Sequence, residues 1–345
     1  MVLLKILISL CVLFAATGCQ LGYILESGYY QADLLKRRVP IDYAIENYKL
    51  SDQEVSRLKL AKDVRQFMKT DLGLDVDSNF TTYVQLDRPY VTYIVSAAHK
   101  DELKAYTWSY PIVGEVPYKG YFKKEKADDE AKSLQKKDLD TYVRGVSAYS
   151  TLGWFADPLL SSMLRYKEHD FVSTLIHETV HTNLYIKSES KFNERVANFM
   201  GQLGAELFYQ KKGKADEFRK TMKKERADDL IFSEFISEQI KMMREWYKAQ
   251  ANRDEILKNR GKKFQEITEA FTQKVKPKLQ TNSYDRIAST ELNNALLLQL
   301  ELYLGDFSDL EKLAEHYQKD FKKVLEALKT LEDETDPESK LKSLF

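Results

Sequence analysis

Residues 175–181 read Leu-Ile-His-Glu-Thr-Val-His, and this segment constrains the fold more than any other. Apolar residues in and around it follow the spacing of a packed helical face: Phe171, Val172, Leu175, Ile176, Val180 and Leu184. On a helix, His177 and His181 project from one side, and Glu178 lies about 100° further round. Both imidazoles can therefore bind one metal ion. This H-E-x-x-H pattern is typical of zinc peptidases, and two core histidines hydrogen-bonded to the backbone are the alternative.

A catalytic zinc ion usually has three protein ligands, so one more is expected outside this segment. Glu194 is the candidate, because it follows a polar turn at 187–191 and precedes apolar residues at helical spacing over 196–207. We predict that Glu194 lies in the first turn of a second helix, where the helix dipole alone would also favour a carboxylate. The predicted site is one Zn²⁺ bound by His177, His181 and Glu194, with Glu178 as the catalytic base.

At these residues the chain resembles a known family. Asn193-Glu194 followed by Ala197, after H-E-x-x-H, is the gluzincin arrangement. The chain is similar to the bacterial predicted-aminopeptidase family, in the gluzincin-like zinc metallopeptidase clan. Further segments resemble that family's signatures at 29–32, 34–35, 38–41, 110–114, 118–122, 148–158 and 292–295. The chain departs from the family pattern at Thr179, Val180, Thr182 and His99-Lys100, which bears on substrate preference more than on metal binding.

The resemblance implies zinc-dependent hydrolysis of a peptide or protein substrate, with aminopeptidase action as the first expectation. A zinc endopeptidase with the same site, and a non-catalytic scaffold with a structural zinc, are the alternatives. Asn193 is a candidate to orient a ligand, and Tyr149 and Tyr185 are candidates to stabilise the oxyanion.

Several other polar residues have no pattern that assigns them a role. The carboxylates available to bind a substrate amine are Asp140, Asp157 and Glu115, and nothing in the sequence selects among them. Asn293 and Asn294 are expected on a helix surface, with packing or hydrogen bonding near the cleft as the alternative. The histidines without a partner at metal-binding spacing are His99, His169 and His316, and we expect them to be structural or exposed.

The N-terminus has the features of a lipoprotein signal peptide. One lysine is followed by an apolar run at 6–16 and then by Ala16-Thr17-Gly18-Cys19. The run is too short to span a membrane comfortably. We expect cleavage before Cys19 and lipidation of that residue, with a plain secretory signal or a retained anchor as alternatives. Because Gln20 follows Cys19, a Gram-negative host is expected to place the protein on the periplasmic face of its outer membrane.

Charge and pattern complete the expectations. The 53 basic and 53 acidic residues cancel, which gives no electrostatic support for nucleic-acid binding. Strand-like segments precede helical ones, which predicts an α+β fold, mostly helical, with a small mixed or antiparallel sheet in the N-terminal half. Local signals include a capping box at Ser51–Glu54, a hairpin at Asp87-Arg88-Pro89 and an edge strand at 141–151. The expected regions are a signal peptide at 1–18, a tether at 19–48, a catalytic region at 49–210, a helical region at 211–335 and a frayed tail at 336–345.

Overall fold

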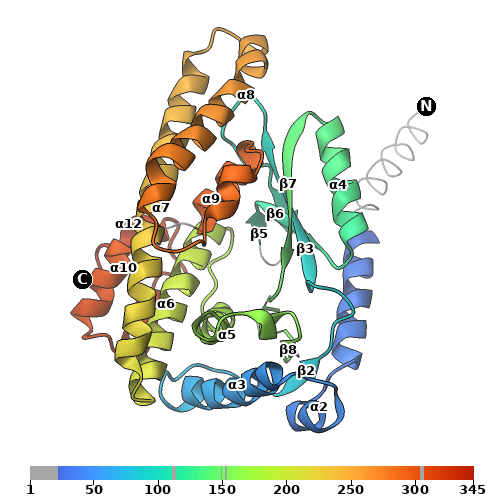
Figure 1. The fold of residues 1–345 in the computed structure, drawn as a ribbon, viewed down its shortest axis with the longest axis vertical. Coiled ribbons are helices and arrows are strands. Elements are labelled where there is room, and N and C mark those ends of the chain that lie inside the picture. The colour runs from blue at the N-terminus through green and yellow to red at the C-terminus, as the bar shows by residue number, and fades with distance from the viewer. Residues whose placement is uncertain (1–21, 111–113, 149, 152–153, 304–306) are drawn as a thin grey trace, which may run out of the picture.

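The computed structural model describes residues 22–110, 114–148, 150–151, 154–303 and 307–345 (Figure 1). Helices predominate, and the strands lie in the N-terminal half, so the α+β prediction is confirmed. A helix at 22–36 precedes the first strand. No helix in the described part of the chain has both the length and the apolar character needed to cross a membrane.

Within the described residues the strands form three small sheets. The central sheet has the order β6-β3-β7 and is antiparallel, so β7 is an edge strand; it covers only the first part of the edge strand predicted at 141–151, since it ends at Val146. The second sheet has the order β1-β2-β8, and the third pairs β4 with β5. The bounds are β1 Val39–Pro40, β2 Thr82–Val84, β3 Thr92–His99, β4 Trp108–Tyr110, β5 Gly114–Val116, β6 Tyr118–Tyr121, β7 Leu139–Val146 and β8 Leu159–Leu160.

The hairpin predicted around Asp87-Arg88-Pro89 is wrong. The segment does connect two strands, β2 and β3, but these strands belong to different sheets. β2 is flanked by β1 and β8, while β3 is flanked by β6 and β7, so neither strand has a free edge for the other. Composition and turn residues show where a strand ends, but they do not show with which strand it pairs.

Alternation of side chains gives the central sheet two different faces. On one face, odd-numbered residues of β3 pack against α4 (Lys124–Lys136) in a small core that contains Tyr93, Val95, Ala97, Ala127, Ala131 and Leu134. On the other face, Ile94 lies opposite Arg144 of β7, and both line a cavity. Ser96 lies on the same face and donates a hydrogen bond to Gln299 of α9 (Asn294–Tyr303). One face of the sheet is therefore covered by α4, and part of the other face borders the cavity.

The main hydrophobic core surrounds the helix that carries the two site histidines. It contains buried residues of α3 (Asp52–Thr70), α5 (Glu168–Asn183) and α6 (Ser190–Lys211). The capping box predicted at the start of α3 is confirmed, since Ser51 accepts from the Glu54 amide and Glu54 accepts from the Ser51 amide. Short helices near the C-terminus join this core, namely α10 Ser308–His316, α11 Phe321–Lys329 and α12 Pro337–Leu341.

The C-terminal segment packs against the main core: where the sequence predicts a frayed tail at 336–345, the structure has helix α12. Asp336 caps α12 by accepting a hydrogen bond from the Ser339 amide. Leu341 is fully buried in the main core, and Glu338 forms an ion pair with Arg195 of α6. The buried Leu341 and Pro337, the Asp336 cap and the Glu338 ion pair together hold this segment, although its charged residues suggest exposure.

A second hydrophobic core lies in the helical body formed by α7 (Ala215–Ala249), α8 (Arg253–Ala270) and α9. In Figure 1, α7 and α8 extend beyond the main core toward the top of the view, beside the central sheet. A π-helical segment at Phe271–Val275 continues α8 into a loop region with short 3₁₀ turns at Lys276–Lys278 and Asp285–Ser289.

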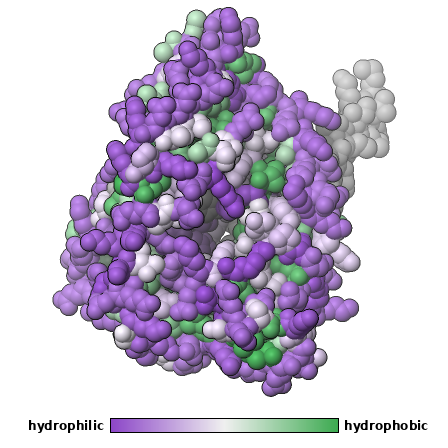
Figure 2. Space-filling model, in the orientation of Figure 1, coloured by the Kyte–Doolittle hydropathy of each residue, from purple (hydrophilic) through white to green (hydrophobic). Residues whose placement is uncertain are grey.

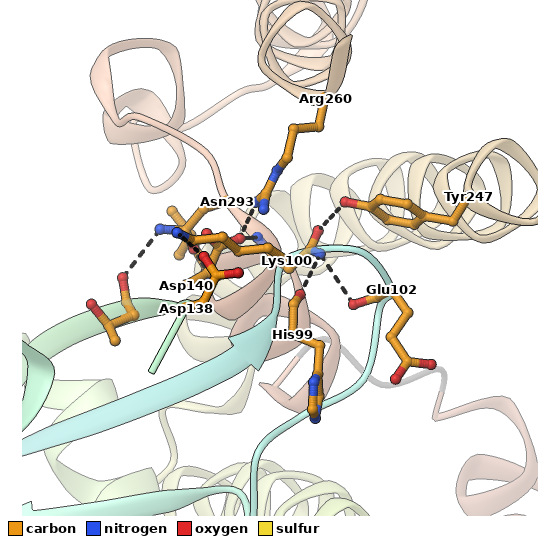
Figure 3. A network of polar contacts seen from close by, with 11 residues as sticks. His99, Lys100, Glu102, Asp138, Asp140, Tyr247, Arg260 and Asn293 are labelled. Carbon is orange, nitrogen blue, oxygen red and sulfur yellow. Dashed lines mark hydrogen bonds and ion pairs between the residues drawn. The ribbon is translucent and has the colours of Figure 1, made fainter. Parts of the chain in front are cut away.

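Polar contacts join this helical body to the central sheet (Figure 3). Arg260 of α8 forms an ion pair with Asp140 of β7, and each side chain is 10% exposed. Asn294 is fully buried: it accepts a hydrogen bond from Tyr247 and donates to the carbonyls of His99 and Glu102. The prediction that Asn294 lies on a helix surface is therefore wrong, because the first turn of α9 is docked against the sheet.

Candidate metal centre and active site

Helix α5 presents the two histidines of the H-E-x-x-H segment to the same point. The apolar residues of α5 are buried in the main core, and this fixes the orientation of the side of the helix that carries the two histidines. His177 and His181 lie one turn apart, and their Nε2 atoms are 3.1 Å from each other. The Thr179 hydroxyl between them donates to the Leu175 carbonyl, so this polar side chain is satisfied inside its own helix.

Helix α6 supplies the carboxylate that the sequence predicts as the third ligand. Glu194 is the fifth residue of α6, just beyond the first turn in which the sequence predicts it, because the helix already begins at Ser190 within the polar segment. Its two carboxylate oxygens lie 3.6 Å from His177 Nε2 and 3.6 Å from His181 Nε2. The side chain of Asn193 holds the loop between the helices, since it accepts from the Ile186 amide and donates to the Ile186 carbonyl. Asn193 therefore braces the loop that leads to Glu194.

The three side chains fit a tetrahedral metal ion. Zinc binds nitrogen and carboxylate oxygen at roughly 2.0–2.2 Å, which places neighbouring ligand atoms of a tetrahedron roughly 3.3–3.6 Å apart. The separations of 3.1 Å and 3.6 Å lie at or near this range. Their ligand atoms form one of two such groups found among the described residues. Two imidazoles and one carboxylate are a donor set suited to Zn²⁺.

Burial sets the protonation of these groups in favour of metal binding. It lowers the pKa of His177 to about 4, and burial together with the adjacent His177 lowers the pKa of His181 well below its usual value. Both imidazoles are therefore neutral at pH 7 and keep a lone pair for a metal. Burial raises the pKa of Glu194 to about 7, although the positive charge of Arg144 opposes this effect. A bound cation would favour the ionised carboxylate.

Glu178 lies next to this group and has the most perturbed carboxyl. Burial raises the pKa of Glu178 to about 8, and the carboxyls of Glu194 and Asp157 add to the effect. A carboxyl with a pKa near the working pH can both accept and release a proton. This is the property that a general acid–base residue requires.

The site opens into a cavity of about 940 Å³. Its walls come from the helix at 22–36, from the open face of the central sheet, and from α5 and α6; they include Tyr23, Ser27, Ile94, Arg144, His177, Glu178, His181 and Glu194. Figure 2 shows a hollow near the middle of the face in view, in the region above α5. The volume is in the range of binding sites for small molecules and short peptide segments.

Comparison with known proteins identifies a family. Residues 22–344 match a protein family described as "Putative aminopeptidase". The chain belongs to this family. Family membership extends from the helix at 22–36 to α12, so it includes both hydrophobic cores and the whole cavity, and it indicates peptidase chemistry. No curated protein and no solved structure matches the chain.

The remaining predicted residues of this aminopeptidase-family protein have different positions. Tyr185 lines the cavity, and burial raises its pKa. Tyr149 and Cys19 lie outside the described residues. None of the three carboxylates considered for amine binding is among the lining residues: Asp140 is paired with Arg260, Asp157 accepts from Thr151, and Glu115 is exposed.

Sequence reasoning missed three residues that the fold brings to the site. Asn198 forms a side-chain hydrogen bond with His177, and its position one turn after Glu194 was a signal for it. Tyr166 and Arg144 line the cavity and interact electrostatically with Glu178 and Glu194, respectively. No spacing rule connects either of them to the H-E-x-x-H segment, because they come from a loop and from β7.

Proposed function

We propose that this chain is a zinc-dependent aminopeptidase held at a membrane surface. The observation that carries the proposal is the convergence of His177, His181 and Glu194 on one point in the wall of a cavity, with Glu178 beside them. A structural zinc site is normally closed by four protein ligands. Among the described residues this group offers three, and the cavity leaves access for water and substrate.

The roles of the residues follow from their chemistry. His177, His181 and Glu194 would hold Zn²⁺ and Asn198 would fix the orientation of His177. When bound, zinc lowers the pKa of water and polarises the scissile carbonyl. Glu178 takes the proton of the attacking water and later delivers it to the leaving amine.

A further donor is needed for the carbonyl oxygen as it becomes negative. Tyr166 and Tyr185 both line the cavity, and burial raises the pKa of each hydroxyl, so both are protonated donors at neutral pH. Tyr166 lies close enough to Glu178 for their charges to interact, which favours it for this role.

The preference for chain ends rests on the family. The N-terminal helix, the sheet and α5 all contribute walls to the cavity, which leaves room for a short peptide segment beside the proposed metal ligands. An endopeptidase with the same residues is the outcome that the experiment below distinguishes.

Membrane attachment is proposed from the N-terminal sequence. Cys19 would be lipidated, and it lies three residues before the helix at 22–36, whose Tyr23 and Ser27 line the cavity. Exposed apolar residues on this helix, Ile24, Leu25 and Tyr29, are compatible with a nearby lipid surface. In a Gram-negative host, the proposed location is the periplasmic face of the outer membrane.

The test compares hydrolysis of peptides with free and with acetylated N-termini by the zinc-loaded protein, before and after zinc is removed by a chelator. We expect cleavage of free N-termini only, loss of activity on chelation, and recovery when zinc is added. Equal cleavage of acetylated peptides would replace aminopeptidase with endopeptidase. Zinc binding without hydrolysis of either substrate would replace the enzyme with a non-catalytic scaffold.

A further inference from the structure

A second group of potential metal ligands lies at the start of α5, away from the H-E-x-x-H segment. It consists of His169 and Asp170 of α5 and Glu225 of α7. His169 precedes His177 by eight residues, so the two groups are separated by roughly 12 Å along the same helix. No spacing pattern connects His169 with Glu225, because 56 positions separate them in the chain.

The geometry of this second group resembles that of the catalytic one. One ligand atom from each of the three residues lies within 4.8 Å of the others. His169 Nε2 is 3.5 Å from a carboxylate oxygen of Glu225, and His169 Nδ1 is 3.4 Å from a carboxylate oxygen of Asp170. The His169 and Glu225 side chains are only 11% and 15% exposed. The Asp170 side chain is 48% exposed, but burial of the neighbouring Glu225 carboxylate is costly unless a cation offsets its charge.

These residues line a separate cavity of about 230 Å³. Asp229, one turn after Glu225 on α7, and Gln202 of α6 line it as well. Two buried atoms around this space make no hydrogen bond within the described parts of the chain: Gln202 Oε1, and His169 Nδ1, whose 3.4 Å contact with Asp170 is an ion-pair distance without hydrogen-bond geometry. Buried polar atoms are normally satisfied, so these two point to a ligand.

A protein cation already approaches this group. The Nζ of Lys167 lies 2.9 Å from Glu225, but its side chain is 61% exposed, so it can move into solvent at little cost. Lysine brings a single positive charge to a space that also faces the carboxylates of Asp170 and Asp229. A divalent ion would offset more of this negative charge and would also bind the imidazole.

We propose that His169, Asp170 and Glu225 form a second binding site for a divalent transition metal, with Zn²⁺ as the fitting ion. An imidazole nitrogen and two carboxylate oxygens are ligands that zinc accepts. The ion joins the first turn of α5 to α7, and it therefore links the helix of the catalytic site to the helical body. Lys167 competes with the ion for Glu225.

The experiment measures zinc binding by the full chain in which the first site has been removed by His177→Ala and His181→Ala. We expect one zinc ion per chain to remain in this variant. Adding Glu225→Gln is expected to weaken the remaining binding at least about tenfold. Glu234→Gln, an exposed change on the same helix, is the matched control and is expected to leave binding unchanged. Lys167→Met is expected to tighten it.

A second measurement does not depend on the double histidine variant being folded. The otherwise unchanged chain is expected to bind two zinc ions, and its Glu225→Gln variant only one. If the double histidine variant is folded and binds no zinc, or if Glu225→Gln and Glu234→Gln bind it equally well, the proposal is wrong. These outcomes do not depend on peptide hydrolysis, so they are independent of the proposed function.

Discussion

Glu178 differs from the three proposed metal ligands because its side chain lies beside their group rather than in it. Glu178→Gln keeps the size of the side chain and removes its ability to accept a proton. We expect kcat to fall roughly 10²–10⁴-fold, the usual contribution of a positioned general base. Zinc content, measured on the same preparation, should equal that of the unchanged protein. Full activity of this variant would falsify the mechanism.

Asn198, unlike Glu178, acts through one of the histidines: it holds His177 by a hydrogen bond and is outside the predicted ligand set. Asn198→Ala should lower zinc affinity about 10–100-fold, the effect expected when the partner of a ligating histidine is lost. Competition with a chromogenic chelator measures the change. The control is Asn259→Ala, which alters an exposed asparagine of α8. Equal affinities in the two variants would show that Asn198 does not position the ligand.

At the scale of helices, the site depends on how closely α5 and α6 approach. Gly201 of α6 makes this approach possible: a Cβ added there would lie 2.8 Å from the Ser173 carbonyl oxygen and 3.3 Å from Cβ of His177. Since the first of these atoms belongs to the backbone, one helix would have to move. The glycine is therefore required by packing, although it lowers the intrinsic stability of the helix that contains it.

Gly201→Ala is expected to destabilise the protein by about 1–3 kcal/mol, as overpacking usually does, and to weaken zinc binding. Gly261→Ala in α8 is the matched control, because no atom lies within 4 Å of its added Cβ. That change should stabilise the protein by roughly 0.8–1.0 kcal/mol through helix propensity. Urea denaturation of both variants gives the comparison. A stabilising effect of Gly201→Ala would contradict the proposed close packing.

At the scale of the whole molecule, the buried pair of Arg260 and Asp140 connects the helical body to the edge strand of the sheet (Figure 3). Arg260→Met would leave a buried carboxylate without its partner, and we expect a loss of about 3–5 kcal/mol in the free energy of unfolding. Arg253→Met removes an arginine whose side chain is 45% exposed, and it should cost much less, because an exposed ion pair contributes little to stability. Similar losses in the two variants would show that the buried pair does not stabilise this junction.

The elements that were predicted well are those whose information is local. The α5 helix follows from its apolar spacing, and the start of α3 follows from the reciprocal hydrogen bonds of Ser51 and Glu54. That Glu194 lies on a second helix follows from the apolar spacing after it, although the helix begins earlier than predicted and Glu194 lies just beyond its first turn. Each of these inferences uses residues that lie within a few turns of one another, where backbone geometry fixes the spacing of side chains.

The predictions that failed required information about distant partners. The segment at Asp87-Arg88-Pro89 has the composition of a hairpin turn, but the strands on either side pair elsewhere. Asn294 has the character of a surface residue, but the sheet covers it. Leu341 lies in a charged tail, but it fills a place in the main core. Burial depends on which elements meet, and helical or strand periodicity does not specify this.

The sequence by itself determined the H-E-x-x-H helix, the carboxylate that joins the two histidines, and the order of strands before helices, because these depend on spacing along the chain. Only the tertiary structure decided which side chains surround that group. It brought Arg144 from β7, Asn198 from α6 and Tyr166 from a loop to the same cavity, and it placed His169 beside Glu225. The physical reason is that contacts between distant segments depend on packing of whole elements, and packing is a property of the assembled core.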